Sequence, residues 1–108
     1  MDQLQHDVLK RDGVWIHYVK SGTSRRQGGG NRTIVLLHGW PQTWWEWRYI
    51  IEPLRSEGWF VVAPDYRGAG SSSKPDGGYD KQTMASDIKA LIEHLGVDTP
   101  VTLVGHDL

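Results

Sequence analysis

Val101-Thr102-Leu103-Val104-Gly105-His106-Asp107-Leu108 closes the sequence and decides which fold the chain can adopt. Residues 101–104 form a short apolar run after Pro100, which is typical of a buried strand. Gly105 permits a sharp turn directly after that strand. Asp107 is therefore expected on a tight elbow between this strand and a following helix.

An aspartate on such an elbow indicates nucleophilic chemistry at a saturated carbon. The related motif Gly-x-Ser-x-Gly carries a serine there, which needs a base to remove its proton. A carboxyl group with an ordinary pKa of about 3.9 is already ionised at neutral pH. Its attack on an epoxide or an alkyl halide gives an ester that water can cleave. The alternative is an aspartate that only caps a helix, so the rest of the chain has to decide.

Composition limits the class of protein. The chain has 108 residues, with 38% hydrophobic and 23% charged residues and a net charge of −1, which is the composition of a globular protein and allows at most one domain over 1–108. No basic field is present for nucleic acid, and no apolar stretch has the roughly 20 residues of a membrane span. The N-terminus lacks the apolar region of a signal peptide, and no cysteine is present for disulfides or thiol chemistry. A cytoplasmic location is expected.

Local patterns predict the elements in order. Asp12-Gly13 between two β-prone runs predicts a hairpin over about 8–19, followed by a surface loop over 21–31. The apolar runs 33–37 and 59–63 predict buried strands. A capping box at Thr43 and Glu46 predicts a helix that stops near Gly58. A second helix is expected from about 80 to 95.

Strands that alternate with helices predict a mostly parallel sheet with right-handed crossovers. Ligands bind beyond the carboxyl ends of such strands. Three polar clusters follow three of the predicted strands and should meet at this edge: His38-Gly39, Asp65-Tyr66-Arg67 and His106-Asp107.

Four blocks of sequence, in this order, resemble the aspartate-nucleophile branch of the α/β-hydrolase family, and most of all its epoxide hydrolases. The resemblance covers the chain from about residue 33 to its end. The blocks are Leu37-His38-Gly39-Trp40-Pro41, Trp44-Trp45-Glu46-Trp47-Arg48, the run 64–75 (PDYRGAGSSSKP) and Val104-Gly105-His106-Asp107.

The resemblance implies the N-terminal portion of an α/β-hydrolase fold that ends at the nucleophile elbow. It implies that Asp107 attacks an epoxide carbon and becomes a covalent ester. The backbone N–H groups of Trp40 and Leu108 would form the oxyanion hole, where each donor is worth roughly 10²–10³ in rate. The bond between Trp40 and Pro41 resembles one that is cis in the family.

Other residues at the strand ends are expected to support the site. His38 and His106 occupy positions that are structural in the family, where the base is a later histidine. Gly39 and Gly105 belong to the same two turns. Asp65 and Arg67 are more readily explained as a charge-assisted pair that fixes their loop than as substrate contacts.

No cofactor is implied, and a metal ion held by His38, Asp65, His106 and Asp107 is disfavoured. Adjacent His106 and Asp107 would both have to bend onto one ion.

Two alternatives remain beside epoxide hydrolysis. A haloalkane dehalogenase would use the same aspartate, but its pattern has Asn and Trp where this chain has Trp40 and Leu108. A hydrolase-like fragment that only binds a ligand or partner is the other.

Family members continue beyond this region with a lid, an acidic residue and the base histidine. The 108 residues alone are therefore expected to be the first part of a longer polypeptide. By themselves they should be inactive and unstable, with the last strand as an open sheet edge.

Overall fold

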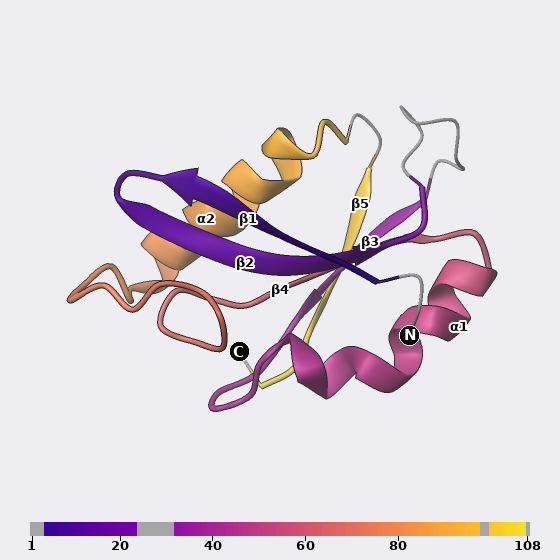
Figure 1. Cartoon of the computed structure of the whole chain (residues 1–108), viewed down its shortest axis with the longest axis horizontal. Coiled ribbons are helices and arrows are strands. Elements are labelled where there is room, and N and C mark those ends of the chain that lie inside the picture. Colours follow the sequence, from indigo (N-terminus) through magenta and orange to yellow (C-terminus); the bar gives the residue numbers. More distant parts are fainter. Residues whose placement is uncertain (1–3, 24–31, 98–99, 108) are drawn as a thin grey trace.

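A mixed five-stranded sheet between two helical layers forms the described part of the chain, which comprises residues 4–23, 32–97 and 100–107 of the computed structural model (Figure 1). The strand order is β1 (Gln5–Arg11), β2 (Val14–Ser21), β4 (Phe60–Pro64), β3 (Thr33–Leu37) and β5 (Val101–Gly105). β3 (Thr33–Leu37) runs parallel to both β4 (Phe60–Pro64) and β5 (Val101–Gly105). The predicted α/β architecture is confirmed. The loop expected over 21–31 falls largely outside the described residues.

The predicted hairpin is confirmed and extends the sheet on the other side. β1 (Gln5–Arg11) and β2 (Val14–Ser21) pair antiparallel, and β2 also pairs antiparallel with β4. Asp12 and Gly13 between them have φ angles of 49° and 78°. A two-residue turn with positive φ at both positions matches the right-handed twist of the flanking strands.

β3 and β4 are buried along their whole length because helices cover both faces of the sheet. Side chains alternate between two cores, as the strand repeat requires. One core lies beneath α2 (Lys81–His94) and the other beneath α1 (Arg48–Ser56). Val35, Leu37, Phe60 and Val62 point into the core beneath α2, and Ile34, Leu36, Val61 and Ala63 into that beneath α1.

The first helical segment differs in one respect from its prediction. It opens at Thr43, whose hydroxyl accepts a hydrogen bond from the Trp45 N–H, but its first turn is a 3₁₀ helix, η2 (Trp44–Trp47), which leads into α1. The expected capping box is wrong, because the Glu46 carboxylate bonds to the backbone of Gly39 and to His106 instead of returning to Thr43. A tertiary partner has replaced the local one.

The second helix agrees with its prediction. Asp80 is the N-cap of α2 and accepts a hydrogen bond from the Thr83 N–H at 2.9 Å. The helix ends before Gly96, whose φ of 68° is the left-handed conformation that glycine adopts readily at a helix C-terminus.

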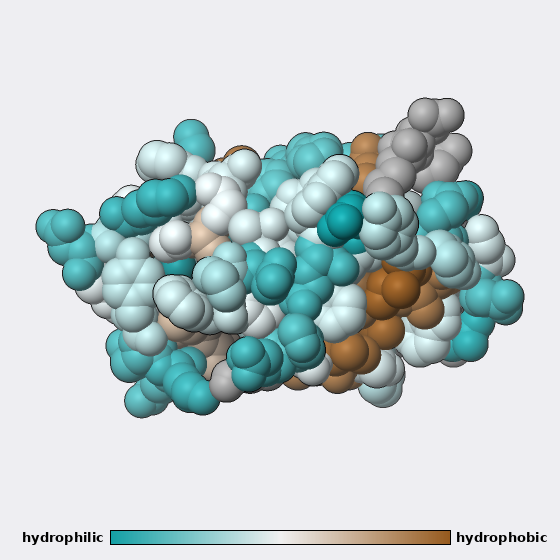
Figure 2. All heavy atoms as spheres, turned by 90° about the horizontal axis from the view of Figure 1, so that it is seen from below, coloured by the Kyte–Doolittle hydropathy of each residue, from teal (hydrophilic) through white to brown (hydrophobic). Residues whose placement is uncertain are grey.

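β5 lies at the edge of the sheet, so the open edge expected from the sequence is present in the described chain. Leu103 in this strand is 57% exposed. On the face seen in Figure 2, apolar side chains gather on the half of the molecule that carries α1, and the other half is mostly polar. No helix within the described ranges is long and apolar enough to cross a membrane.

Neighbouring isoleucines in α1 provide a matched test of the core beneath this helix. Ile51 is 1% exposed and Ile50 is 40% exposed. We expect Ile51→Ala to lower the free energy of unfolding by about 2–4 kcal/mol because it leaves a cavity against β3 and β4. Ile50→Ala should cost less than about 1 kcal/mol. Urea unfolding of the protein that contains this chain measures both, and equal losses would contradict the packing described.

Candidate active site

The carboxyl ends of β3, β4 and β5 meet at one edge of the sheet, as predicted. The loop after β3 touches the elbow after β5 at Gly39. A Cβ atom on Gly39 would lie 2.6 Å from the His106 carbonyl oxygen and 3.0 Å from the Asp107 Cβ. Only a residue without a side chain allows this approach, so Gly39 brings the two loops into direct contact.

Asp107 lies on a sharp bend. The strand ends at Gly105, and the His106 N–H donates to the Leu37 carbonyl at 3.1 Å. The next residue, Asp107, has a φ of 53°, in the left-handed region that residues other than glycine seldom adopt. Such backbone conformations persist where the surrounding structure enforces them, often at functional sites.

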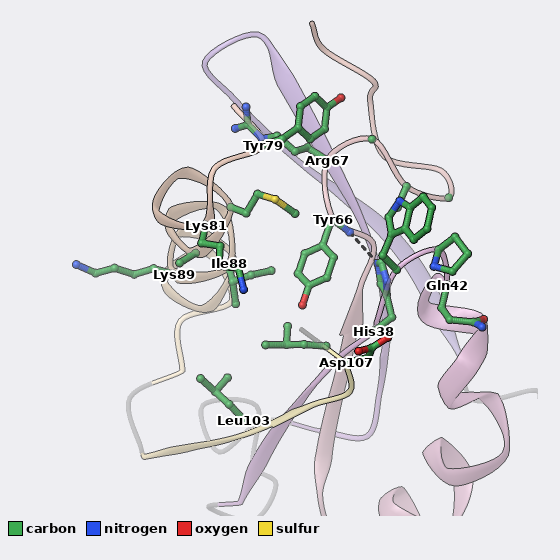
Figure 3. A pocket seen from close by; sticks show the side chains of 18 of the residues that line it. His38, Gln42, Tyr66, Arg67, Tyr79, Lys81, Ile88, Lys89, Leu103 and Asp107 are labelled. Carbon is green, nitrogen blue, oxygen red and sulfur yellow. Dashed lines mark hydrogen bonds between the residues drawn. The ribbon is translucent and has the colours of Figure 1, made fainter. Parts of the chain in front are cut away.

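The Asp107 carboxylate faces a groove of about 1240 Å³ that runs between α2 and the ends of β3 and β5. In Figure 3 the Asp107 and His38 side chains both line the groove, and Leu103 lines it further along β5. Most of the lining is apolar, including Leu37, Met84, Ile88, Ile92 and Leu103. The aspartate is therefore accessible and stands beside an apolar surface.

His38 is buried beneath the site, and both of its ring nitrogens are engaged. Nδ1 donates to the Gly39 carbonyl at 2.9 Å, and Nε2 accepts from the Tyr66 N–H at 3.1 Å. These two bonds fix one tautomer of the ring. They join the loop after β3 to the loop after β4, which fits the structural role expected for this histidine.

His106 is more exposed, and its Nδ1 pairs with the Glu46 carboxylate. The other oxygen of Glu46 accepts the Gly39 N–H at 3.0 Å. A single carboxylate thus bridges the turn at Gly39 and the residue that precedes Asp107.

Trp40 and Pro41 follow Gly39 at the mouth of the groove. Their peptide bond is cis, as the resemblance implied. The indole is 86% exposed. Among the described residues no oxygen accepts a hydrogen bond from the Trp40 N–H. Leu108, the other predicted backbone donor, lies outside the described residues.

Asp65 is fully buried and accepts hydrogen bonds from three directions. His17 Nδ1 and the Trp44 N–H each lie 2.8 Å from its oxygens, and the Ser71 N–H lies at 3.1 Å. Burial works to raise the pKa of Asp65, but the hydrogen bonds from His17, Trp44 and Ser71 outweigh burial and hold this pKa below its ordinary value.

The expected pair between Asp65 and Arg67 is wrong. Arg67 turns away from the sheet, and its Nε and Nη2 donate to the two oxygens of Asp87 in α2 at 2.8 and 2.9 Å. Both carboxylates are buried, so each needs several hydrogen bonds. Asp65 receives them from backbone N–H groups and His17, whereas Asp87 receives a two-pronged contact from a guanidinium group.

Sequence reasoning missed His17, and it named Tyr66 and Glu46 without the roles that they have in this region. The Tyr66 ring lines the groove and packs against His38 with centroids 4.4 Å apart (Figure 3). Burial, together with the nearby Glu46 charge, raises the pKa of Tyr66 to about 12. Within the described ranges, no three histidine or acidic side chains gather closely enough to hold a metal ion.

Comparison with known proteins agrees with this geometry. Residues 32–108 match the family described as alpha/beta hydrolase fold. The chain is similar to a soluble epoxide hydrolase of Corynebacterium sp. (strain C12), with 45% identity over 97% of this chain and 34% of the relative.

Two solved structures share the fold. The epoxide hydrolase CorEH superposes with a TM-score of 0.84 and 44% identity over 96% of this chain and 34% of that one. Epoxide hydrolase VrEH1 from Vigna radiata gives a TM-score of 0.85 and 35% identity over 99% of this chain and 33% of that one. The chain therefore spans about a third of the length of these proteins.

Gly39→Ala tests the contact between the two loops. The added methyl group would press on the backbone of His106, so we expect a loss of about 1–3 kcal/mol in the free energy of unfolding. Gly77→Ala is the control, because a Cβ at Gly77 would meet nothing within 4 Å. Thermal unfolding compares the two variants, and equal midpoints would show that the loops do not touch at Gly39.

Asp65→Asn tests the buried carboxylate through the pH dependence of stability. Because the folded pKa is lowered, ionised Asp65 contributes stability above its unfolded pKa of about 3.9, and this contribution fades as the pH falls through the lower folded value. At pH 7 we expect the variant to lose about 2–3 kcal/mol. Urea unfolding between pH 7 and pH 3 should show that the difference in free energy of unfolding between the wild type and Asp65→Asn narrows only below about pH 4. A difference that widens on acidification would contradict the lowered pKa.

Proposed function

Because the chain belongs to the α/β-hydrolase family, we propose that the protein containing it is an epoxide hydrolase that forms a covalent ester on Asp107. The relatives described above carry the name epoxide hydrolase. One observation carries the assignment to this residue. Asp107 stands at a left-handed bend that is packed against Gly39, the residue that precedes Trp40.

In the first step the Asp107 carboxylate attacks one epoxide carbon from the side opposite the ring oxygen. A carbon–oxygen bond to Asp107 forms as the epoxide bond breaks, and the released alkoxide takes a proton from an acid. By the family resemblance that acid belongs to a lid outside this chain. The apolar lining of the groove suits the carbon framework of such a substrate.

In the second step water attacks the carbonyl carbon of the ester. The resulting oxyanion accepts hydrogen bonds from the N–H groups of Trp40 and Leu108, and its collapse releases the diol and restores Asp107. A base histidine activates the water. Neither His38 nor His106 suits this role, because His38 is buried with both nitrogens engaged and His106 pairs with Glu46.

His38, Gly39, Pro41, Gly105 and His106 act in this scheme by shaping the two turns. Asp65 and Arg67 act less directly. They fix the loop after β4 to η2 and to α2. The reaction needs no cofactor.

A single turnover in ¹⁸O-labelled water tests the covalent step. Water attacks the ester carbonyl, so we expect the label in the Asp107 carboxylate and unlabelled oxygen in the first diol formed. Mass spectrometry of the peptide containing residue 107 measures the label. Label in the diol alone would show direct attack by water and remove the ester from the scheme.

Substitution of the nucleophile supports this test. Asp107→Ala should lower kcat/KM by at least about 10³-fold, since it removes the group that bonds to substrate. Asp76→Ala, a change of the same kind in an exposed loop, should leave the rate unchanged. Halide release from chloroalkanes without diol formation from epoxides would instead identify a dehalogenase.

A further inference from the structure

Glu46 joins the two turns that the proposed reaction brings together. Its Oε1 accepts the Gly39 N–H at 3.0 Å, and its Oε2 pairs with His106 Nδ1. Gly39 immediately precedes Trp40, and His106 immediately precedes Asp107. The Glu46 carboxylate therefore links the residue before the proposed oxyanion donor to the residue before the proposed nucleophile.

The side chain of Glu46 is held firmly enough to fix a distance. Its 3₁₀ turn is anchored at one end by the bond from the Trp44 N–H to buried Asp65, at 2.8 Å. Thr43 caps the same turn through the Trp45 N–H, and the Glu46 N–H donates to the Thr43 carbonyl at 3.0 Å. The Glu46 side chain itself is only 14% exposed. Because this turn is held by several hydrogen bonds, the Glu46 carboxylate has a fixed position.

Two opposing effects set the distance between the Gly39 turn and the elbow. Hydrogen bonds to Glu46 draw the Gly39 turn and the elbow together, and the backbone of His106 against the Cα of Gly39 sets the limit of approach. The separation between the Trp40 N–H and Asp107 is defined by both effects. A small change in this separation matters, because a donor stabilises an oxyanion only within about 2.7–3.1 Å of it.

We propose that Glu46 is a positioning residue for ester hydrolysis, holding the Trp40 N–H where the oxyanion of the Asp107 ester develops. This inference rests on the proposed function. Alkylation of Asp107 creates no charge at the carboxyl oxygen that the Trp40 N–H would stabilise, whereas hydrolysis of the ester does. Loss of Glu46 should therefore slow the second step more than the first.

The experiment is a rapid-quench reaction of the complete protein with an excess of styrene oxide, followed by intact-protein mass spectrometry. Glu46→Ala should lower the rate of ester hydrolysis by about 10- to 100-fold, a fraction of the roughly 10²–10³ that one oxyanion donor supplies. The covalent adduct, which adds the mass of one epoxide, should accumulate in this variant. The rate of adduct formation should stay close to that of the wild type.

Three further variants separate positioning from general stability. Glu52→Ala removes a glutamate that pairs with Arg55 on the surface of α1 and should leave both steps unchanged. Glu46→Gln keeps an acceptor for the Gly39 N–H and a donor for His106, so its hydrolysis rate should lie between those of the wild type and Glu46→Ala. His106→Ala combined with Glu46→Ala should be no slower than Glu46→Ala alone, because both changes break the same link.

The outcomes divide cleanly. Adduct accumulation in Glu46→Ala, with adduct formation intact, supports the proposal. Equal slowing of both steps, or an unchanged hydrolysis rate, overturns it while leaving the function standing, provided that the wild type forms the adduct. A wild type that hydrolyses epoxide in ¹⁸O-labelled water without label in Asp107 overturns the covalent ester of the proposed function itself.

Discussion

The buried carboxylate of Asp65 is the interaction on which the arrangement of the site depends. An ionised carboxylate without solvent needs several donors, and here they come from β2, from η2 and from the loop after β4. Each donor belongs to a different stretch of the chain. Satisfying one charge therefore fixes the positions of three segments at once, directly beneath the edge where the strands end.

The order of dependence runs outward from this carboxylate. Asp65 holds the Trp44 N–H, and the 3₁₀ turn that begins at Trp44 carries Glu46. Glu46 then bonds to the Gly39 turn and to the elbow at His106. On the opposite side, His17 ties the N-terminal hairpin into the same network, and His6 hydrogen-bonds to the outer nitrogen of His17 at 2.9 Å. The hairpin is thus part of the support for the site.

Local chemistry explains which elements were predictable. The central strands follow from their apolar runs, the Asp12-Gly13 turn from residues that accept positive φ, and α2 from its apolar repeat and its caps. Each of these signals acts within a few residues. The turn at Gly39 and the bend at Asp107 were predictable for the same reason. Their convergence followed from the geometry of parallel strands.

The partners of the charged side chains were not predictable, because they depend on distances in space. Arg67 and Asp87 are separated by 20 residues, and nothing near either one marks the other. At Glu46 the local pattern was misleading. Its carboxylate accepts the Gly39 N–H from another loop instead of the backbone N–H at Thr43 that a capping box would use. Neighbouring positions in sequence, such as Asp65 and Arg67, suggested a pair that the opposite directions of their side chains prevent.

At Trp40 the side chain and the backbone have different roles. The indole is exposed to solvent, whereas the backbone N–H is the group that the proposed reaction uses. Because the side chain is exposed at the mouth of the groove, another side chain at position 40 meets few neighbours in the described chain. A fluorophore or a photo-crosslinker attached at position 40 would therefore report the arrival of a molecule at the groove.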